Sequence, residues 1–465
     1  MKHSLKVYGT FALINVILVT LIISCGDKVI LIPYPAPPGL TTSPDIKLTV
    51  DNKPVWVERA GSKLEKFDHD LGLYGGRRLE DMDAAGFAFE GKVKLRITAS
   101  EKIEKFVIRP KSLNIKAKVR DNQIIFSLTS PAKLYIEINN LPHLAIFADA
   151  PEINPLYESG DGVTYFGPGE HRPGKIVLTS NHSIYIAAGA IVYADIMGQD
   201  LSDVKIRGRG MLQGTIRVTG TTNLHVNDIF IKNTRGWTNT LINCRNSSYR
   251  NVKVFSFEGI YGLDGINPVS SKNFTIDNCF MRCRDDCVAI KSPDYNLSVD
   301  SVYVTNCVMV GWSCSDGITL GFELNGGPVQ NVVVKNCDIL YARGGGRTEG
   351  HSGFSIVCDG PATIQNILFE DIRVEEQVEF KNLELIVTPG TYYGNDPPGH
   401  IKNIKMKNVS WENATKPFIL NGLSAENMVG NITFENCTIG GKVLRSLSDA
   451  DFRINEFTGN IVFLP

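Results

Sequence analysis

Hydrophobic and polar positions alternate in one recurring phrase through the second half of the chain. Each copy begins with Asn or a similar residue, continues with alternating apolar residues and closes with Asn or Asp and a small or apolar residue. The copies begin at Asp203, Asn223, Asn251, Asn273, Ser301, Asn331, Asn366, Asn403 and Asn431, at intervals of 20 to 37 residues. Alternation without helical periodicity, repeated at this interval, predicts a β-solenoid in which each copy forms one coil.

Asn-Cys pairs within the repeat indicate how the coils stack. Five occur, at 243–244, 278–279, 306–307, 336–337 and 436–437. Residues at one phase of successive coils form ladders, where free cysteine behaves as a small apolar residue. Asparagines at a fixed phase suit turns that need left-handed backbone geometry. We therefore expect a cysteine ladder, since the spacing is not that of a disulfide scaffold.

A different pattern precedes the repeat. Between 46 and 150, short alternating segments such as VKLRITA and KLYIEIN are separated by turn signals such as RDNQ. Short strands at this spacing predict an antiparallel β-sandwich domain over residues 46–150. Residues 151–465 are then the solenoid domain.

The first 45 residues predict export and anchoring. A basic start, an apolar stretch at the lower limit for crossing a bilayer and a small residue before Cys25 indicate a signal peptide over 1–24. The end of this stretch resembles the bacterial lipobox, which implies lipidation of Cys25. Residues 25–45 carry five prolines and suit an extended tether. We expect a protein of the bacterial cell envelope that meets the membrane only through its lipid.

The composition of the chain limits which classes of partner are expected. Lys and Arg number 48 and Asp and Glu number 49, with no basic run interleaved with aromatics, so nucleic acid is not an expected partner. The 43% of hydrophobic and 21% of charged residues are ordinary for a soluble protein. We expect a monomer that acts on a polysaccharide or oligosaccharide.

Four acids fall at nearly one phase of neighbouring coils. Counted from the predicted coil starts, the first lies 13 residues along, an adjacent pair lies 12 and 13 along, and the fourth lies 15 along. They are Asp264, Asp285, Asp286 and Asp316. Stacked strands are about 4.8 Å apart, so these carboxylates should form one cluster on a lateral face. Adjacent acids share a site only where the backbone bends, so RDDC at 284–287 predicts a turn.

Three motifs around these acids resemble glycoside hydrolase family 28, the polygalacturonase family. LDGIN at 263–267, RDDCVAIKS at 284–292 and SDGITLG at 315–321 are similar to that family's NTDG, DDC-A-I-KSG and GHG-SIGS motifs. The order of sandwich and solenoid is more similar to family 49, the dextranases of the same clan. The resemblance implies an all-β fold, a right-handed parallel β-helix preceded by a small antiparallel β-sandwich.

The resemblance also implies catalytic roles. Asp285 would be the general acid, and Asp264 and Asp286 the bases that activate water, so that hydrolysis inverts the anomeric carbon. Coil spacing of about 4.8 Å, taken alone, suggests the closer carboxylate separation of retaining enzymes. No cofactor is expected, and no His, Cys or Asp spacing resembles a metal site.

Two departures from the family bear on the substrate. Asp316 stands where the third motif has histidine, and GFSI at 353–356 stands where the fourth motif, R-I-K, engages the substrate's carboxylate. This argues against polygalacturonate, although Arg343 or Arg347 in a neighbouring insert could restore a positive charge.

Further candidates surround the acids. Arg284, Asp316 and His351 are candidate substrate-binding residues, although an ion pair explains Arg284 equally well and His351 is a loop histidine. Tyr261 and Trp312 are expected either to stack on sugar rings of the substrate or to pack against other side chains of the protein.

Cys287 and Cys314 bracket the acid coils as a family disulfide does, or belong to the cysteine ladder. Two other function classes stay open. A polysaccharide lyase would need a base beside a uronate, often with calcium, and would release unsaturated products. A non-catalytic glycan-binding solenoid would not depend on the acids.

Overall fold

The computed structural model describes residues 29–60, 82–233, 236–256, 262–311, 315–342, 353–376, 381–389 and 398–465, nearly all of them in strands and turns. The predicted signal peptide of residues 1–24 and the lipidation site Cys25 lie outside the described residues. So do Tyr261, Trp312, Cys314, Arg343, Arg347 and His351. None of the helices in the described ranges has the length and apolar character needed to cross a bilayer.

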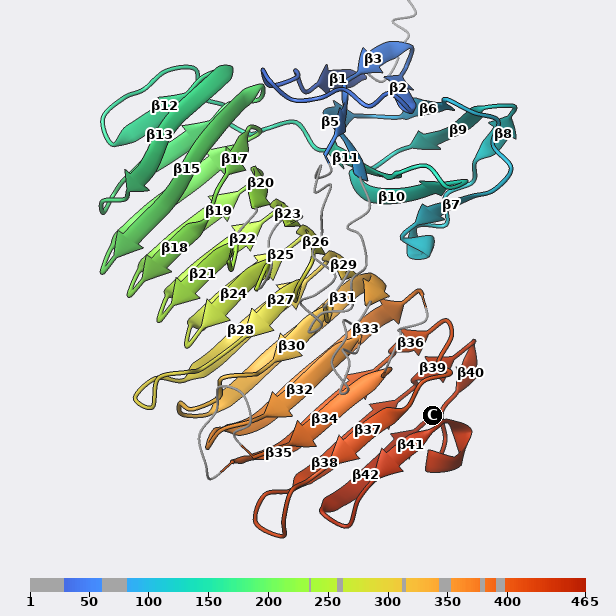
Figure 1. Ribbon diagram of the computed structural model, residues 1–465, viewed down its shortest axis with the longest axis vertical. Coiled ribbons are helices and arrows are strands. Elements are labelled where there is room, and N and C mark those ends of the chain that lie inside the picture. Colours follow the sequence, from blue (N-terminus) through green and yellow to red (C-terminus); the bar gives the residue numbers. More distant parts are fainter. Residues whose placement is uncertain are drawn as a thin grey trace, which may run out of the picture.

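Two sheets around one apolar core form an N-terminal β-sandwich (Figure 1). The first sheet holds, in spatial order, β1 (Ile30–Pro33), β5 (Met82–Glu90), β11 (His143–Asp149), β10 (Ala132–Ile138) and β7 (Phe106–Arg109), with β4 (Val57–Arg59) also on β5. The second holds β3 (Lys53–Val55), β2 (Ile46–Val50), β6 (Val93–Ala99), β9 (Gln123–Leu128) and β8 (Lys118–Arg120). Pairing is antiparallel except between β5 and β11. These two can run parallel because the chain visits the second sheet between them.

The segment expected to be an extended tether contributes to this sandwich. β1 pairs antiparallel with β5, with Ile30 opposite Glu90. Tyr34 is buried, and its hydroxyl donates to Asp149 (3.0 Å). The tether expectation is therefore wrong for this stretch, because prolines are compatible with an edge strand and Leu31 packs against the sandwich core.

The rest of the chain is a parallel β-helix with three sheets, and successive coils add one strand to each (Figure 1). The first sheet comprises β12 (Val163–Phe166), β14 (Ser183–Ile186), β16 (Ser202–Gly208), β19 (Thr222–Asn227), β22 (Arg245–Arg250), β25 (Lys272–Asp277), β28 (Val299–Thr305), β31 (Val329–Ala342), β33 (Thr363–Val374), β35 (His400–Lys407), β38 (Val429–Glu435) and β42 (Thr458–Leu464).

The second sheet comprises β13 (Gly169–Val177), β15 (Ala190–Gln199), β17 (Met211–Gln213), β20 (Phe230–Asn233), β23 (Lys253–Ser256), β26 (Phe280–Cys283), β29 (Val308–Gly311), the ends of β31 and β33, β36 (Ser410–Trp411) and β39 (Thr438–Ile439), with β40 (Lys442–Val443) antiparallel to β39. The third continues from β15 into β18 (Ile216–Thr219), β21 (Asn239–Ile242), β24 (Ile266–Val269), β27 (Val288–Ile290), β30 (Ile318–Leu320), β32 (Phe354–Cys358), β34 (Leu383–Val387), β37 (Phe418–Asn421) and β41 (Phe452–Ile454).

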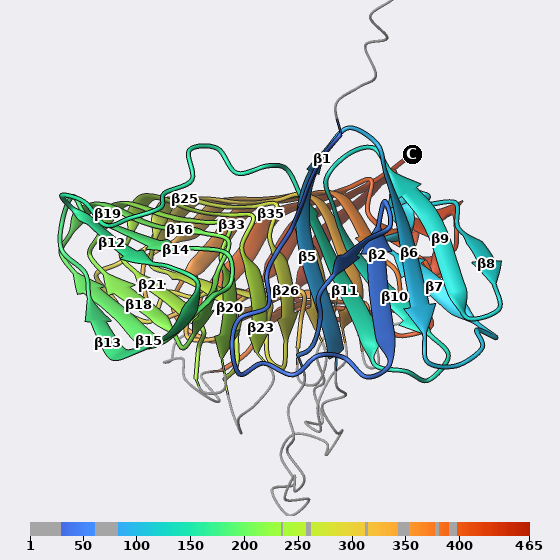
Figure 2. The ribbon, with the colours of Figure 1, turned by 90° about the horizontal axis from the view of Figure 1, so that it is seen from above.

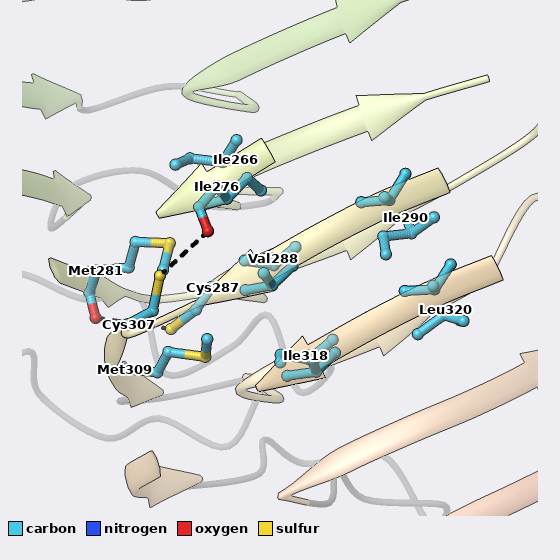
Figure 3. Packing of buried hydrophobic residues seen from close by; sticks show 14 of the residues in the cluster. Ile266, Ile276, Met281, Cys287, Val288, Ile290, Cys307, Met309, Ile318 and Leu320 are labelled. Carbon is cyan, nitrogen blue, oxygen red and sulfur yellow. Dashed lines mark hydrogen bonds between the residues drawn. The ribbon is translucent and has the colours of Figure 1, made fainter. Parts of the chain in front are cut away.

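Apolar side chains from all three sheets fill the coils. In the third sheet Ile266 pairs with Val288 and Val288 with Ile318, so like residues stack in rows (Figure 3). The predicted cysteine ladder is present at the corner after the first sheet, where Cys307 Sγ accepts the N–H of Cys279 (3.4 Å).

The predicted membership of Cys244 in this ladder is wrong. Its N–H donates to Ser271 Oγ (3.0 Å) at the corner between the third and first sheets. Both corners use an Asn followed by a small buried residue, so the local sequence does not distinguish them.

Asparagines in the left-handed conformation turn the chain at these corners, as predicted. φ is +53° at Asn408 and +49° at Asn436. Asn436 Nδ2 donates to Asn408 Oδ1 (2.8 Å), and Asn408 Nδ2 donates to Asp371 Oδ1 (2.8 Å). The left-handed conformation costs an ordinary residue about 1–2 kcal/mol, and asparagine tolerates it through such local bonds.

One predicted coil start is displaced. Asn273 Nδ2 donates to Asn246 Oδ1 (2.7 Å), so this coil begins at Asn246 and not at Asn251. Asn251 lies at the next corner, where its N–H donates to the Asp277 carbonyl (3.0 Å). The phrase was assigned to the wrong corner because β22 reads RNSSYR, with little apolar alternation.

The sandwich packs its first sheet against the outer face of the second helix sheet (Figure 2). Ring centroids of Phe147 and Phe280 are 5.1 Å apart, and Asp149 accepts a hydrogen bond from Lys253 (2.7 Å). Burial works to raise the pKa of Asp149, but Lys253 and Arg209 outweigh it and lower that pKa to about 2. This interface holds the second sheet, whose strands β26 and β29 lead directly into the acid-bearing turns.

Candidate active site

Three consecutive turns between the second and third helix sheets carry the predicted acids. Asp264 precedes β24, Asp285 and Asp286 link β26 to β27, and Asp316 precedes β30. Because these third-sheet strands pair in register, Asp264, Asp286 and Asp316 share one phase of the stack. Asp285 lies one residue earlier. The correct phase follows even though one coil start was counted from the wrong corner, because the coil of Asp264 carries extra residues before β24.

The carboxylates of Asp264, Asp285 and Asp286 converge. Each offers one oxygen, and these oxygens lie within 4.8 Å of one another. Asp264 and Asp286 are 2% and 8% exposed, whereas Asp285 is half-buried. Asp285 Oδ1 accepts the N–H of Asp286 (3.1 Å), which closes the turn. The bend predicted from the adjacent pair thus brings both acids into one cluster.

Asp264 is the most buried of the three acids. Asn267 Nδ2 donates to its Oδ2 (2.7 Å), and the Lys291 ammonium lies 3.8 Å from the same oxygen. Burial raises the pKa of Asp264 to about 7; Lys291 opposes the rise, and the charge of Asp285 adds to it. Burial penalises the ionised form of a carboxyl group, so Asp264 can hold a proton near neutral pH.

Lys291 is a site residue that sequence reasoning missed. It is 8% exposed, lies 3.6 Å from Glu323 and sits 4.2 Å above the centre of the Trp237 ring. Burial lowers the pKa of Lys291, but Asp264 and Glu323 more than offset this, so the pKa is raised. The signal in the sequence is a lone lysine directly after the buried VAI strand.

Two hydroxyl groups fix the carboxylate of Asp316. Its Oδ2 accepts hydrogen bonds from Thr319 (2.9 Å) and from Ser355 on the adjoining strand β32. Its N–H donates to Asp286 Oδ1 (3.0 Å). Ser355, at the position where the fourth family motif has a cation, therefore serves a carboxylate of the protein, and Asp316 connects this serine to the acid cluster.

The remaining predicted residues divide into two groups. Arg284 is 4% exposed and belongs to the same turn as the acid pair. Cys287 has a buried free thiol 3.7 Å from the Met281 carbonyl oxygen, whereas Cys314 lies outside the described ranges (Figure 3). His351 also lies outside them, so the described cluster consists of the aspartates and Lys291, with Arg284 in the same turn as the acid pair.

Comparison with known proteins places this arrangement in a family. The model of glycosyl hydrolases family 28 matches residues 187–450, which contain all three acid turns. The chain belongs to this family. A family 28 assignment agrees with the motifs at 263–267, 284–292 and 315–321.

Curated relatives match over parts of their length. Exopolygalacturonase clone GBGA483 of Arabidopsis thaliana is 29% identical over 250 residues, which cover 51% of this chain and 51% of that relative. Probable endopolygalacturonase D of Neosartorya fischeri is 24% identical over 343 residues, covering 69% and 66%. The matches thus span about half to two thirds of these relatives.

Solved structures share the fold. Dex49A from Penicillium minioluteum superposes with a TM-score of 0.55 at 15% identity, covering 93% of this chain and 96% of that one. An exopolygalacturonase from Thermotoga maritima superposes with a TM-score of 0.51 at 17% identity, covering 65% and 84%. The first likeness extends over the sandwich as well as the β-helix, as the resemblance to family 49 implied.

The acid cluster also has the oxygen donors that a divalent cation prefers. Three features of this chain disfavour a cation there. Asp264 holds a proton near neutral pH, Asn267 already donates to its Oδ2, and the Lys291 ammonium 3.8 Å away repels a second positive charge.

Millimolar Ca²⁺ or prolonged chelation is therefore expected to leave the melting temperature and turnover unchanged. A ligand that binds only the folded protein raises its stability, so a calorimetric scan with and without CaCl₂ reports occupancy directly. A calcium-dependent rise in melting temperature that a chelator reverses would contradict this expectation.

Proposed function

We propose that this protein hydrolyses O-glycosidic bonds of a polysaccharide or oligosaccharide by acid-base catalysis at the Asp264, Asp285 and Asp286 cluster. The observation that carries the proposal is the convergence of three carboxylates within 4.8 Å, one of them with a pKa raised to about 7. Hydrolysis requires one protonated and one ionised carboxyl group at the scissile bond. Membership of family 28 supports the reaction class.

The geometry suggests how the proton moves. Asp264 holds a proton in its buried setting and lies close enough to Asp285 to pass it on. Asp285, the most exposed of the three, donates the proton to the leaving oxygen as the glycosidic bond breaks. Asp264 and Asp286, then ionised, take a proton from the water that attacks the anomeric carbon. The cluster thereby recovers its proton.

Inversion at the anomeric carbon is part of the proposal and rests on the motif resemblance. Carboxylate oxygens that lie within 4.8 Å of one another are closer to the about 5–5.5 Å of retaining enzymes than to the about 6.5–9.5 Å of inverting ones. The proposal requires that a substrate and a water molecule between the side chains widen this gap. Proton NMR of the first product anomer distinguishes the two outcomes.

We further infer, from residues 1–25 of the sequence, that the enzyme is a lipid-anchored protein of the bacterial cell envelope. The basic start, apolar stretch and lipobox-like Cys25 support this placement.

Asp285→Asn is expected to lower turnover at least about a hundredfold, since general acid catalysis contributes about 10²–10⁴-fold. Its melting temperature should change little, because the side chain is half-buried and the change relieves repulsion between like charges. Asp294→Asn, at an exposed position in the same coil, is the matched control and should keep full turnover. Loss of folding in Asp285→Asn would instead assign the acid pair a structural role.

The pH dependence follows from the raised pKa of Asp264. The cluster keeps a proton for the leaving group below about pH 7 and loses it above, so kcat/KM should fall as pH rises through about 7. Initial rates between pH 5 and 9 at constant ionic strength measure this limb. A rate that stays constant from pH 6 to 9 contradicts the assigned proton store.

The substrate is proposed to be neutral at the subsites around the scissile bond. The described part of the site gathers more carboxylates than cations: Asp264, Asp285, Asp286, Asp316 and Glu323 beside Arg284 and Lys291. Lys291 is already engaged by two carboxylates, and Ser355 replaces a cation that would pair with a uronate. A uronate would therefore meet uncompensated negative charge.

On a panel of purified glycans, kcat/KM on a neutral polysaccharide should exceed that on polygalacturonate. Products are best followed by reducing-end release, with absorbance of unsaturated sugars as the check for a lyase. Turnover of homogalacturonan above every neutral glycan would overturn the substrate proposal while leaving hydrolysis intact.

A further inference from the structure

The outer face of the second sandwich sheet is strongly basic. Along β6, Val93, Leu95 and Ile97 point into the sandwich core, so Lys94 and Arg96 point outward. The register places Arg96 opposite Ile125 of β9, and Ile125 opposite Lys118 of β8. Cations from two different strands are thereby aligned across this face.

These side chains line a groove rather than a flat surface. A cavity of about 610 Å³ lies between β6, β9, β8 and the segment 113–118. Its lining includes five cations and no carboxylate: Lys94, Arg96, Lys116, Lys118 and Arg120. Asn114, Ser127, Thr129 and Ser130 add hydrogen-bonding groups. The volume is within the usual range of about 300–1,000 Å³ for ligand sites.

The positive charge of this groove is not neutralised by the described protein. Some exposed cations of the β-helix have carboxylate partners, as in Lys335 with Glu370 (2.7 Å) and Lys405 with Glu435 (2.6 Å). The five groove cations form no such ion pair with any described residue, and Lys116 bonds only to Asn114 (2.7 Å). In a chain with a net charge of −1, this concentration of unpaired cations attracts anions.

The chemistry of the lining selects among anionic partners. Arginine recognises carboxylates and sulfates through paired hydrogen bonds, and hydroxyl and amide groups bind sugar hydroxyls. Nucleic-acid bases need exposed aromatic rings to stack on, and the aromatic residue of the lining, Phe126, is buried at 3% exposure. A concave groove admits a single polymer chain, whereas a bilayer surface requires cations on a convex or flat face.

We propose that this groove, bounded by β6, β8, β9 and residues 113–118, binds an anionic polysaccharide through its carboxylate or sulfate groups. The sheet that carries it faces away from the β-helix, since the other sandwich sheet occupies the interface (Figure 1). The groove is thus separate from the acid cluster, and binding there does not depend on the proposed hydrolysis. An acidic polymer can be retained by the protein without being cut.

Binding to polygalacturonate and to dextran sulfate tests the proposal, with unsubstituted dextran as the neutral probe. The full-length Asp285→Asn protein serves as host, so that turnover does not alter the polymer. Affinity electrophoresis should show retardation by at least one anionic polymer that exceeds any retardation by dextran, and raised NaCl should weaken this retardation by the anionic polymer because salt screens exposed charges. The two anionic arms distinguish carboxylate from sulfate recognition.

The groove variant Arg96→Gln/Lys118→Gln should weaken this binding about tenfold or more. The control variant Lys175→Gln/Arg245→Gln removes two exposed cations from the β-helix and should bind as the host does. Circular dichroism verifies that both variants fold. Equal losses of affinity in both variants would attribute the binding to net charge alone and overturn the proposal. Unchanged binding by the groove variant would show that the groove is not the binding site. Capture by vesicles of anionic phospholipid without retardation by either polymer would assign the groove to a membrane and overturn the proposal.

Discussion

Hydrogen bonds between parallel strands of successive coils are the constraint on which the rest of this structure depends. They fix the spacing of neighbouring coils at about 4.8 Å, so a residue type repeated at one phase becomes a row in space. The apolar rows of Ile266, Val288 and Ile318 and the row of Asp264, Asp286 and Asp316 arise from the same pairing of β24, β27 and β30. The apolar core and the candidate active site therefore both result from the same pairing of strands between coils.

Corners make this stacking possible. A coil must turn between sheets without leaving backbone groups unpaired, and left-handed asparagines such as Asn408 and Asn436 do so while bonding to the next coil. The sandwich adds a second support, because its first sheet covers the second helix sheet with a buried aromatic cluster. Strands β26 and β29 are thus held on one side by the core and on the other by the sandwich. A turn between such strands can keep carboxylates close together despite their repulsion.

The repulsion between these carboxylates affects the pKa of Asp264. Removing Asp264 from water disfavours its charged form, and the neighbouring Asp285 disfavours it further. Lys291 limits this rise in the pKa of Asp264, so that the carboxyl group can still ionise. Ser355 and Thr319 meanwhile occupy Oδ2 of Asp316. The roles proposed for Asp264 as proton store and Asp285 as donor thus agree with the depth of each side chain, buried for Asp264 and half-buried for Asp285.

The sequence by itself determined the repeat, the β-helix, the preceding sandwich and the acid cluster, because periodicity of two and the adjacent Asp285 and Asp286 are local signals that stacking turns directly into geometry. It did not determine which corner an Asn-Cys pair occupies, since Asn243 and Asn278 turn the chain with the same residue types. Nor did it show that β1 joins the sandwich, that Lys291 reaches Asp264, or that Ser355 bonds to Asp316. Those contacts join residues many positions apart, and only the register between coils decides which side chains meet.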